Sequence, residues 1–146
     1  MTMSSALRFY FDIVNPEELL YSGEVAMVSA PTVLGEIGIL PRHSPLLARL
    51  QPGTVRIILP DEFPQVIYVA GGILEIQPHR VTILADTAIR AKDLDEALAM
   101  QAKRDAEAVL RHRAKDCDCA QAAARLNIAL AQLKTIDYLR HLKTRS

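Results

Sequence analysis

The chain has 146 residues, half of them hydrophobic, and its formal net charge is zero. This length suits one domain, or a small domain with an appendage, and the apolar fraction excludes an intrinsically disordered chain. No apolar run approaches the ~20 residues that a membrane-spanning helix requires. Residues 1–6 lack the basic and apolar regions of a signal peptide. We therefore expect a cytoplasmic protein that contacts a membrane only through a partner.

The charges are unevenly distributed along the chain. Residues 1–86 carry 5 Lys and Arg against 9 Asp and Glu, whereas residues 87–146 carry 12 against 8. From Arg111 onward the excess is larger, with 8 basic residues against 3 acidic ones. A basic segment of this kind indicates an acidic partner, which can be a protein, a nucleic acid or a membrane surface.

The first part of the chain has the pattern of a β domain. All eight prolines lie at or before Pro78, and all six glycines lie at or before Gly72. The short apolar or alternating runs between them are residues 7–13, 23–29, 54–59, 66–70, 73–76 and 81–84. Such runs, separated by turn residues every 8–12 positions or so, are typical of an antiparallel sandwich or barrel. Gly71-Gly72 and residues 77–79 predict the turns on either side of the strand at 73–76.

The pattern becomes helical after Ala85. Asp93 is the predicted N-cap of a first helix, and Glu96, three residues later, completes a capping box. A second helix follows, for which Asp116 or Asp118 is the expected cap. Apolar residues recur at helical spacing, at Leu94, Ala97, Leu98, Ala102, Ala106, Val109 and Leu110 and then at Ala122, Leu126, Ala129, Leu130, Leu133, Ile136 and Leu139. The short connection predicts an antiparallel two-helix hairpin.

The sequence thus predicts an α+β protein with two parts. An N-terminal antiparallel β-sandwich occupies residues 1–86, a hinge residues 87–92, and a C-terminal antiparallel helical hairpin residues 93–146. Both helices have thin, alanine-rich apolar faces that bury little area, so we expect the core to lie mainly in the sandwich. Elements of low local stability are the ones that detach and move. We therefore predict a rigid sandwich that carries a detachable hairpin.

Four stretches resemble the ε subunit of bacterial F-type ATP synthase. They are GEIGILPRHSPLL at residues 35–47, QPG at 51–53, GGILEI at 71–76 and LADTAIRA at 84–91. The resemblance covers nearly the whole chain, in the order and at the spacing that are usual for the family. It implies the same fold, a β-sandwich followed by a helical hairpin.

The resemblance also implies a function. Such a subunit is a non-catalytic part of the rotating central stalk, without a cofactor of its own. Its sandwich binds the γ subunit and sits on the membrane-embedded c-ring. Its hairpin folds against the sandwich or extends along γ toward the catalytic ring of α and β subunits, where it inhibits ATP hydrolysis. The implied location is the cytoplasmic face of the bacterial plasma membrane, as a peripheral part of the proton-translocating complex.

The loop that begins at Gly35 is the interface that the resemblance assigns to the c-ring, and the residues concerned are Glu36, Ile37, Gly38 and His43. Without the resemblance, this loop would be a solvent-exposed turn, because an isolated Glu and His seven positions apart do not make a site. It is also not a phosphate loop, because it lacks the Gly-Lys-Ser/Thr ending and no long helix follows it.

Two further groups of charged residues are candidates for regulatory contacts. The resemblance implies that the basic hairpin meets an acidic segment of a catalytic β subunit, through Arg111, Arg113, Lys115, Arg125, Lys134 and Arg140. Asp86 and Arg90 are four residues apart in the hinge region and are predicted to pair across a turn. Such a surface pair contributes about 0.5 kcal/mol or less, although it can help to set the docking of the hairpin.

Residues 94–99 depart from a motif that some bacterial ε subunits use to bind ATP between the two helices. That motif is Ile/Leu-Asp-x-x-Arg-Ala, and in this chain Leu98 occupies the arginine position. Ile128 and Gln132 stand where those relatives have basic residues. A guanidinium donates hydrogen bonds to a nucleotide through a planar fork, and leucine cannot. We therefore expect weak nucleotide binding or none, and interpret Asp95 as a first-turn carboxylate that the helix dipole favours.

No metal site or catalytic arrangement is expected. The four histidines have no partner at helical spacing and no clustered ligands; they are His43, His79, His112 and His141. Cys117 and Cys119 are too few for zinc and would form a strained disulfide, so we expect surface thiols rather than a redox switch. No Ser-His-Asp or Cys-His arrangement is visible.

Two alternative functions remain at this point. One is a free-standing binding module whose basic hairpin contacts nucleic acid. The aromatic content is only 5%, tryptophan is absent, and Tyr138 is the sole aromatic residue of the helical part. That composition offers no stacking platform for bases, so no nucleic-acid partner is predicted. The other alternative is a nucleotide-sensing protein, which the leucine at position 98 disfavours.

Overall fold

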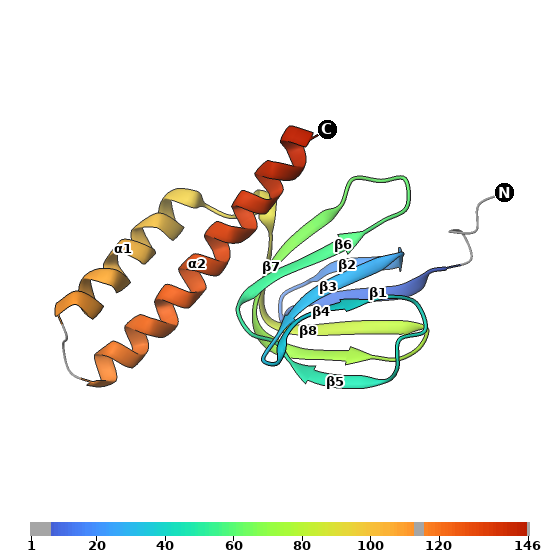
Figure 1. The fold of residues 1–146 in the computed structure, drawn as a ribbon, viewed down its shortest axis with the longest axis horizontal. Coiled ribbons are helices and arrows are strands. Elements are labelled where there is room, and N and C mark those ends of the chain that lie inside the picture. The colour runs from blue at the N-terminus through green and yellow to red at the C-terminus, as the bar shows by residue number, and fades with distance from the viewer. Residues whose placement is uncertain (1–6, 113–115, 146) are drawn as a thin grey trace.

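The computed structural model describes residues 7–112 and 116–145. A β domain is followed by two helices that lie beside it (Figure 1), which confirms the predicted α+β class. The strands are β1 (Phe9–Val14), β2 (Leu19–Val25), β3 (Met27–Thr32), β4 (Gly35–Ile39), β5 (Leu46–Arg49), β6 (Gly53–Ile58), β7 (Gln65–Ile76) and β8 (Arg80–Arg90). A 3-10 turn, η2 (Ala91–Asp93), leads into α1 (Glu96–His112) and then α2 (Asp116–Arg145).

The strands form two layers that share their longest members. The hydrogen-bonded order is β2-β1-β8-β7-β6-β3-β4, and β5 also pairs with β7. The first part of β7, Gln65 to Val69, pairs with β6, whereas the part from Ile73 to Ile76 pairs with β5. β8 follows β7 along nearly its whole length. The chain therefore closes a sandwich by bending two long strands from one layer into the other.

The core of the sandwich follows the period-two alternation of its strands. In β1, the side chains of Phe9, Phe11 and Ile13 are buried, and the residues between them face outward. Val81 and Ile83 repeat this pattern in β8. Large, fully buried apolar side chains also come from β3, β4, β6 and β7. The sandwich thus has a hydrophobic core of its own.

The prediction of a turn at Gly71-Gly72 is wrong, because both glycines lie inside β7. Their φ angles are +77° and +119°, which side chains rarely adopt. A Cβ on Gly72 would lie 2.2 Å from the carbonyl oxygen of Leu84. The two glycines bend β7 without ending it. The turn predicted at residues 77–79 is confirmed, since Gln77 and Arg80 exchange backbone hydrogen bonds across it.

The sequence also failed to separate β2 from β3. The apolar run at 23–29 contains the end of one strand and the start of the next, with Ala26 between them. The first residues of β2, from Leu19, carried no recognised strand pattern. They follow a turn in which the Asn15 side chain accepts hydrogen bonds from the backbone N–H groups of Glu17 and Glu18. This turn aligns β2 with β1.

The first helix begins two residues later than predicted. Asp93 is the last residue of η2 and does not cap a helix. Asp95 takes that role, because its Oδ1 accepts a hydrogen bond of 3.1 Å from the backbone N–H of Leu98. The side chain of Asp95 therefore anchors the start of α1.

Replacing Asp95 by alanine should destabilise the first turn of α1 by about 1 kcal/mol, because one backbone donor loses its acceptor. Amide hydrogen exchange at Leu98 and Ala99 should then accelerate about fivefold. Asp93→Ala is the matched control and should leave these rates unchanged. Equal acceleration in the two variants would contradict the assignment of the cap.

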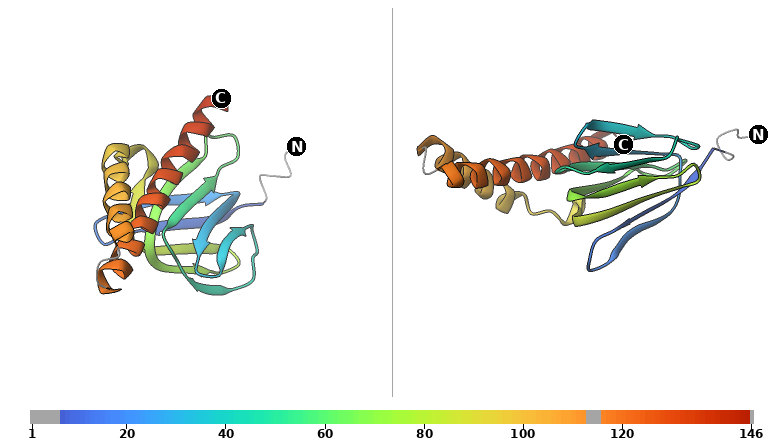
Figure 2. Two further views of the ribbon diagram at one scale, coloured as in Figure 1. Left: turned by 60° about the vertical axis from the view of Figure 1, so that its left-hand side comes forward. Right: turned by 90° about the horizontal axis from the view of Figure 1, so that it is seen from below.

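The two helices form the predicted antiparallel hairpin, with α2 between α1 and the sandwich (Figures 1 and 2). Within residues 96–112 and 118–145, every buried side chain is small, namely Ala99, Ala106, Ala122, Ala129, Ala131 and Thr135. Leu98, assigned to the buried stripe by the sequence, is 68% exposed. The hairpin therefore has thin, alanine-rich contacts, as its composition indicated.

None of the helices described is long and apolar enough to cross a membrane.

Candidate functional site

The hairpin rests on the sandwich through α2, which packs against β6 and β7. In this contact, the hydroxyls of Thr54 on β6 and Thr135 on α2 are 2.7 Å apart. Thr135 is fully buried, and its hydroxyl donates to the carbonyl oxygen of Ala131 at 2.8 Å. Since a hydroxyl has only one hydrogen, Thr54 must donate in the pair between the two threonines. The contact is thus a complete chain of hydrogen bonds.

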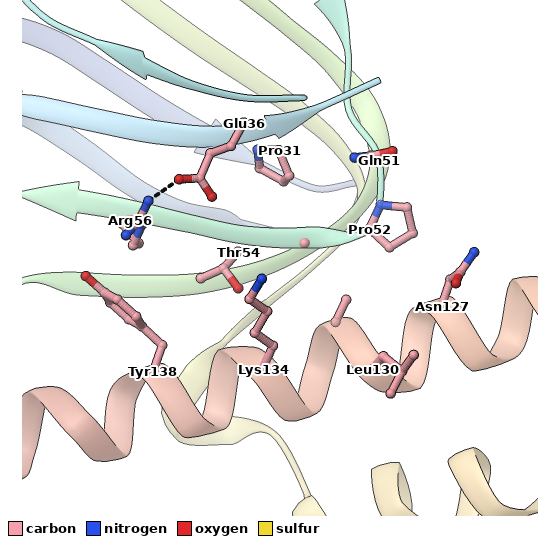
Figure 3. A pocket seen from close by; sticks show the side chains of 12 residues that line it. Pro31, Glu36, Gln51, Pro52, Thr54, Arg56, Asn127, Leu130, Lys134 and Tyr138 are labelled. Atoms are coloured by element: carbon pink, nitrogen blue, oxygen red, sulfur yellow. Dashed lines mark hydrogen bonds and ion pairs between the residues drawn. The ribbon is translucent and has the colours of Figure 1, made fainter. Parts of the chain in front are cut away.

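A second contact involves Arg56 of β6. Its guanidinium carbon lies 5.2 Å from the centre of the Tyr138 ring of α2, within the range of a cation–π interaction. Its Nε donates to the hydroxyl of Ser29 at 2.8 Å, and its terminal nitrogen forms an ion pair with Glu36. Figure 3 shows the guanidinium between the carboxylate and the aromatic ring.

A third contact joins Tyr68 of β7 to Gln132 of α2. Burial raises the pKa of the Tyr68 phenol above its ordinary value of 10, and the hydrogen bond with the Gln132 side chain acts in the opposite direction. The phenol is therefore neutral at physiological pH, and the Tyr68 side chain is almost fully buried, on the opposite face of β7 from the core residues Ile67 and Val69. Among the described residues, no buried side-chain polar atom lacks a hydrogen-bond partner.

Beside these contacts, the sandwich and α2 are separated by an open groove of about 670 Å³. Pro52 and Glu36 line it from the sandwich, and Leu130 and Lys134 line it from α2 (Figure 3). The interface therefore consists of a few polar contacts at the side of a groove. If the two parts were joined by a continuous layer of apolar side chains, those side chains would fill this groove.

The residues predicted to face the c-ring lie on and after β4, at one end of the sheet order. Ile37 packs in part against the core, and Gly38 lies against the Met27 side chain. His43 is in the exposed turn that follows β4, where its Nδ1 is 2.8 Å from the carbonyl oxygen of Ser44. Glu36 pairs with Arg56. The structure thus places these residues on one strand and its turn, without a contact between Glu36 and His43 among the described interactions.

The predicted pairing of Asp86 with Arg90 is wrong. Both residues belong to β8, and residues four apart in a strand lie roughly 13 Å from each other. Arg90 instead pairs with Glu18 at 3.2 Å and donates to the carbonyl oxygen of Leu20 at 3.0 Å. Residues 87–90, predicted as part of the hinge, are the last residues of β8, and η2 follows them.

The basic residues of the hairpin have varied surroundings. Arg140 forms an exposed ion pair of 2.7 Å with Glu96, which joins the end of α2 to the start of α1. Lys134 lines the groove, and Arg111 is exposed in the last turn of α1. Arg125 lines a second cavity, of about 270 Å³, between the two helices. Arg113 and Lys115 lie outside the described residues.

The second cavity is lined by two of the positions considered for nucleotide binding, Ile128 and Gln132, and by none of residues 94–99. Alanines line much of it, and its charged side chains are Asp105 and Arg125. Ile128 and Gln132 contribute from α2, and the Asp95 carboxylate is engaged as the helix cap. Arg125 is thus the one cationic side chain of this lining that could pair with a phosphate group, and the Asp105 carboxylate would repel such a group.

The part of the chain that the structure describes contains no group of three metal-ligating side chains. Cys119 is half-buried near the start of α2, and the side chain of Cys117 lies outside what the structure describes.

The residues that join the hairpin to the sandwich were missed by sequence reasoning. Thr135 stands among the apolar residues of the second helix, and Tyr68 lies within an apolar strand. A polar residue at a buried position is a signal that a partner exists. However, the sequence does not say that the partner of Thr135 is Thr54, which lies 81 positions away.

Comparison with known families accounts for almost the whole described chain. Residues 8–91 match the model of the ATP synthase Delta/Epsilon chain, beta-sandwich domain. Residues 92–137 match the model of the ATP synthase Delta/Epsilon chain, long alpha-helix domain. The boundary between the two matches coincides with η2.

The chain is also similar to bacterial proteins named ATP synthase epsilon chain. It is 52% identical to the one from Halorhodospira halophila over 130 residues, which cover 88% of this chain and 92% of the relative. It is 53% identical to the one from Thioalkalivibrio sulfidiphilus over 136 residues, which cover 92% and 96%.

Solved structures support the fold. A chain of the Euglena gracilis mitochondrial ATP synthase (OSCP/F1/c-ring) superposes with a TM-score of 0.78 at 19% identity, covering 85% of this chain and 78% of that one. A chain of the Tetrahymena thermophila mitochondrial ATP synthase (central stalk/c-ring) superposes with a TM-score of 0.61 at 13% identity, covering 88% and 96%. Together with the matches of the sandwich and of the hairpin, these similarities show that the chain belongs to the epsilon-chain family of ATP synthases.

Proposed function

We propose that this chain is a non-catalytic rotor subunit of a proton-translocating F-type ATP synthase, in which the sandwich couples the γ subunit to the c-ring. The hairpin acts as a conformational brake on ATP hydrolysis. The observation that carries the proposal is the interface between α2 and the sandwich. It consists of Thr54–Thr135, Arg56–Tyr138 and Tyr68–Gln132, beside an open groove.

An interface of this kind suits a reversible contact. Each polar group can exchange its partner for water, so the net free energy of such a hydrogen bond is only about 0.5–1.5 kcal/mol. The sandwich has its own core, whereas the hairpin buries only alanines and one threonine among its described side chains. Release of the hairpin therefore uncovers no large, fully buried apolar side chain of the described helices, and on the sandwich it uncovers the Tyr68 ring. The released helices would carry their basic residues to an acidic segment of a catalytic β subunit.

The outer surface of the sandwich supports the rotor role. Leu84 and Ile73 are exposed neighbours on β8 and β7, and Leu47 is 69% exposed on the adjoining β5. Leu34, in the turn before β4, is 86% exposed. Exposed apolar groups next to one another are typical of protein interfaces. We assign the first three to γ, and the Leu34 turn with Glu36, Ile37, Gly38 and His43 to the c-ring.

The remaining assignments follow from this role. The protein contacts the membrane only through the complex, on the cytoplasmic face of the bacterial plasma membrane. Asp86 and Arg90 lie on the final part of β8, from which the connection to the hairpin leaves. We propose that the bending occurs after Arg90, in η2 and the two residues before α1. Nucleotide binding by this subunit would be weak or absent, since Leu98 offers no guanidinium.

Deleting residues 92–146 should leave the complex assembled and increase its ATP hydrolysis several-fold, because the brake is removed while the sandwich stays. The measurement is ATPase activity of the purified complex, with subunit composition checked by gel electrophoresis. Loss of γ or the c-ring from the truncated complex, or unchanged hydrolysis at every nucleotide concentration, would refute the brake.

Affinity capture separates the proposal from the alternatives. The full chain should retain γ and c subunits. Retention of nucleic acid in a salt-sensitive manner would favour the free-standing binding module. Titration with ATP tests the nucleotide sensor, and tight binding would overturn the interpretation of Leu98.

A further inference from the structure

The Arg56 side chain contacts three other elements at once. From β6 it reaches Ser29 on β3, Glu36 on β4 and Tyr138 on α2. Glu36 belongs to the strand and turn that we assign to the c-ring, and Tyr138 belongs to the movable hairpin. One guanidinium thus lies between the two surfaces through which the subunit is proposed to act (Figure 3).

The orientation of this guanidinium is fixed from the sandwich. Ser29 accepts a hydrogen bond from Nε at 2.8 Å, and Glu36 engages a terminal nitrogen. Because the group is planar and rigid, two partners at different nitrogens define its plane. The Tyr138 ring then meets it at 5.2 Å. Removing either sandwich partner allows the plane to turn, and the attraction to the ring weakens.

We propose that Arg56 couples the Glu36 surface to the docking of the hairpin, so that a cationic group which engages the Glu36 carboxylate favours release of α2. This inference rests on the proposed function for its biological role. The effect of the Glu36–Arg56 pair on the docking of α2 is a property of the isolated chain and can be measured on it. Glu36 is a positioning residue, because it acts on Tyr138 through Arg56.

Thermodynamic linkage makes the coupling reciprocal. If the Glu36–Arg56 pair favours the docked hairpin, then the docked hairpin favours that pair by the same factor. A lysine or arginine of a partner competes with Arg56 for the same carboxylate, so its binding is expected to be weaker while α2 is docked. Binding at the Glu36 carboxylate and docking of α2 would thereby weaken each other, without a large movement of the sandwich.

The test measures how often the hairpin leaves the sandwich. Thr135 is fully buried against β6, so a cysteine placed there reacts with an alkylating reagent only after release. In a Thr135→Cys, Cys117→Ser, Cys119→Ser background, the alkylation rate reports the fraction of released hairpin. Glu36→Gln, which keeps the size of the side chain, should raise this rate about threefold. Tyr138→Leu should raise it by a similar factor.

The coupling is identified by the double variant. With leucine at position 138, Glu36→Gln should have no further effect, because the ring that senses the guanidinium is gone. Arg56→Lys keeps the charge but loses the fork, and it should also abolish the effect of Glu36→Gln. Glu75→Gln neutralises an exposed carboxylate on β7 and should leave the rate unchanged.

The proposal is overturned if Glu36→Gln leaves the alkylation rate unchanged, or if it accelerates alkylation equally with tyrosine and with leucine at position 138. Thermal unfolding of each variant checks that the sandwich is intact. These measurements use the isolated chain, so their outcome is independent of whether the hairpin inhibits hydrolysis. The truncation at Lys92 tests that point separately.

Discussion

Replacing Gly72 by alanine is expected to destabilise the sandwich by about 3 kcal/mol or more. The backbone there has a φ of +119°, which is strained for any residue with a side chain. The added Cβ would also lie 2.2 Å from the carbonyl oxygen of Leu84, a backbone atom that cannot turn away. A domain of this size is typically stable by only about 5–15 kcal/mol, so the loss is large.

Gly35→Ala is the matched control for this variant. Its φ of +116° is nearly the same, but a Cβ there meets no atom within 4 Å. Chemical denaturation of both variants separates backbone strain, which they share, from the steric clash, which only Gly72→Ala has. Equal losses of stability in the two variants would contradict the account of β7 as a strand bent at a tight packing point.

The strands could be predicted where the alternation of apolar and polar residues is sufficient to define them. Alternation alone identifies the buried Phe9, Phe11 and Ile13, because side chains of a strand point to opposite faces. The error at Gly71-Gly72 has a physical reason. Consecutive glycines permit both a turn and a bend inside a strand. The bend is favoured here because strands pair with β7 on both sides of it, and a single sequence does not reveal that pairing.

The start of the hairpin shows a similar limit. Asp93 and Asp95 both precede an apolar helical pattern, and either one is a suitable cap by type. The choice depends on η2, in which Ala91 is buried at 4% exposure and Asp93 is the last residue, so that α1 begins only after it. The expected Asp86–Arg90 pair failed because the four-residue rule belongs to helices, and this segment is still a strand.

The candidate site was the least predictable part. The alanine-rich stripes correctly indicated that the buried side chains of the described helices are small. They did not indicate where the hairpin docks. That information lies in pairs such as Thr54 with Thr135, in which each residue alone is unremarkable in its element. Complementary polar groups far apart in sequence become visible only when the fold brings them together.

Joining the hairpin to the sandwich by a disulfide is expected to have the second large effect. The hydroxyls of Thr54 and Thr135 are 2.7 Å apart, so cysteines at these positions should bond with little adjustment of the backbone. The disulfide would hold α2 on the sandwich covalently, and by closing a loop of 81 positions it would also stabilise the folded chain against unfolding by about 4 kcal/mol. Release of α2 from the sandwich would then be negligible under oxidising conditions.

The native thiols must be removed from this design. Cys117 and Cys119 are therefore replaced by serine, which leaves the introduced cysteines as the only pair able to react. The single variants Thr54→Cys and Thr135→Cys, treated with the same oxidant, control for the loss of the hydroxyls. Electrophoresis without reductant reports the fraction of subunit that is cross-linked.

The direct test of the account is the ATPase activity of the complex that contains the Thr54→Cys/Thr135→Cys subunit, before and after reduction. We predict that the oxidised complex hydrolyses ATP several-fold faster, since its hairpin cannot extend, and that a reductant restores the slow rate. Equal rates in the oxidised and reduced complexes, with cross-linking complete, would contradict a brake that works by leaving the sandwich.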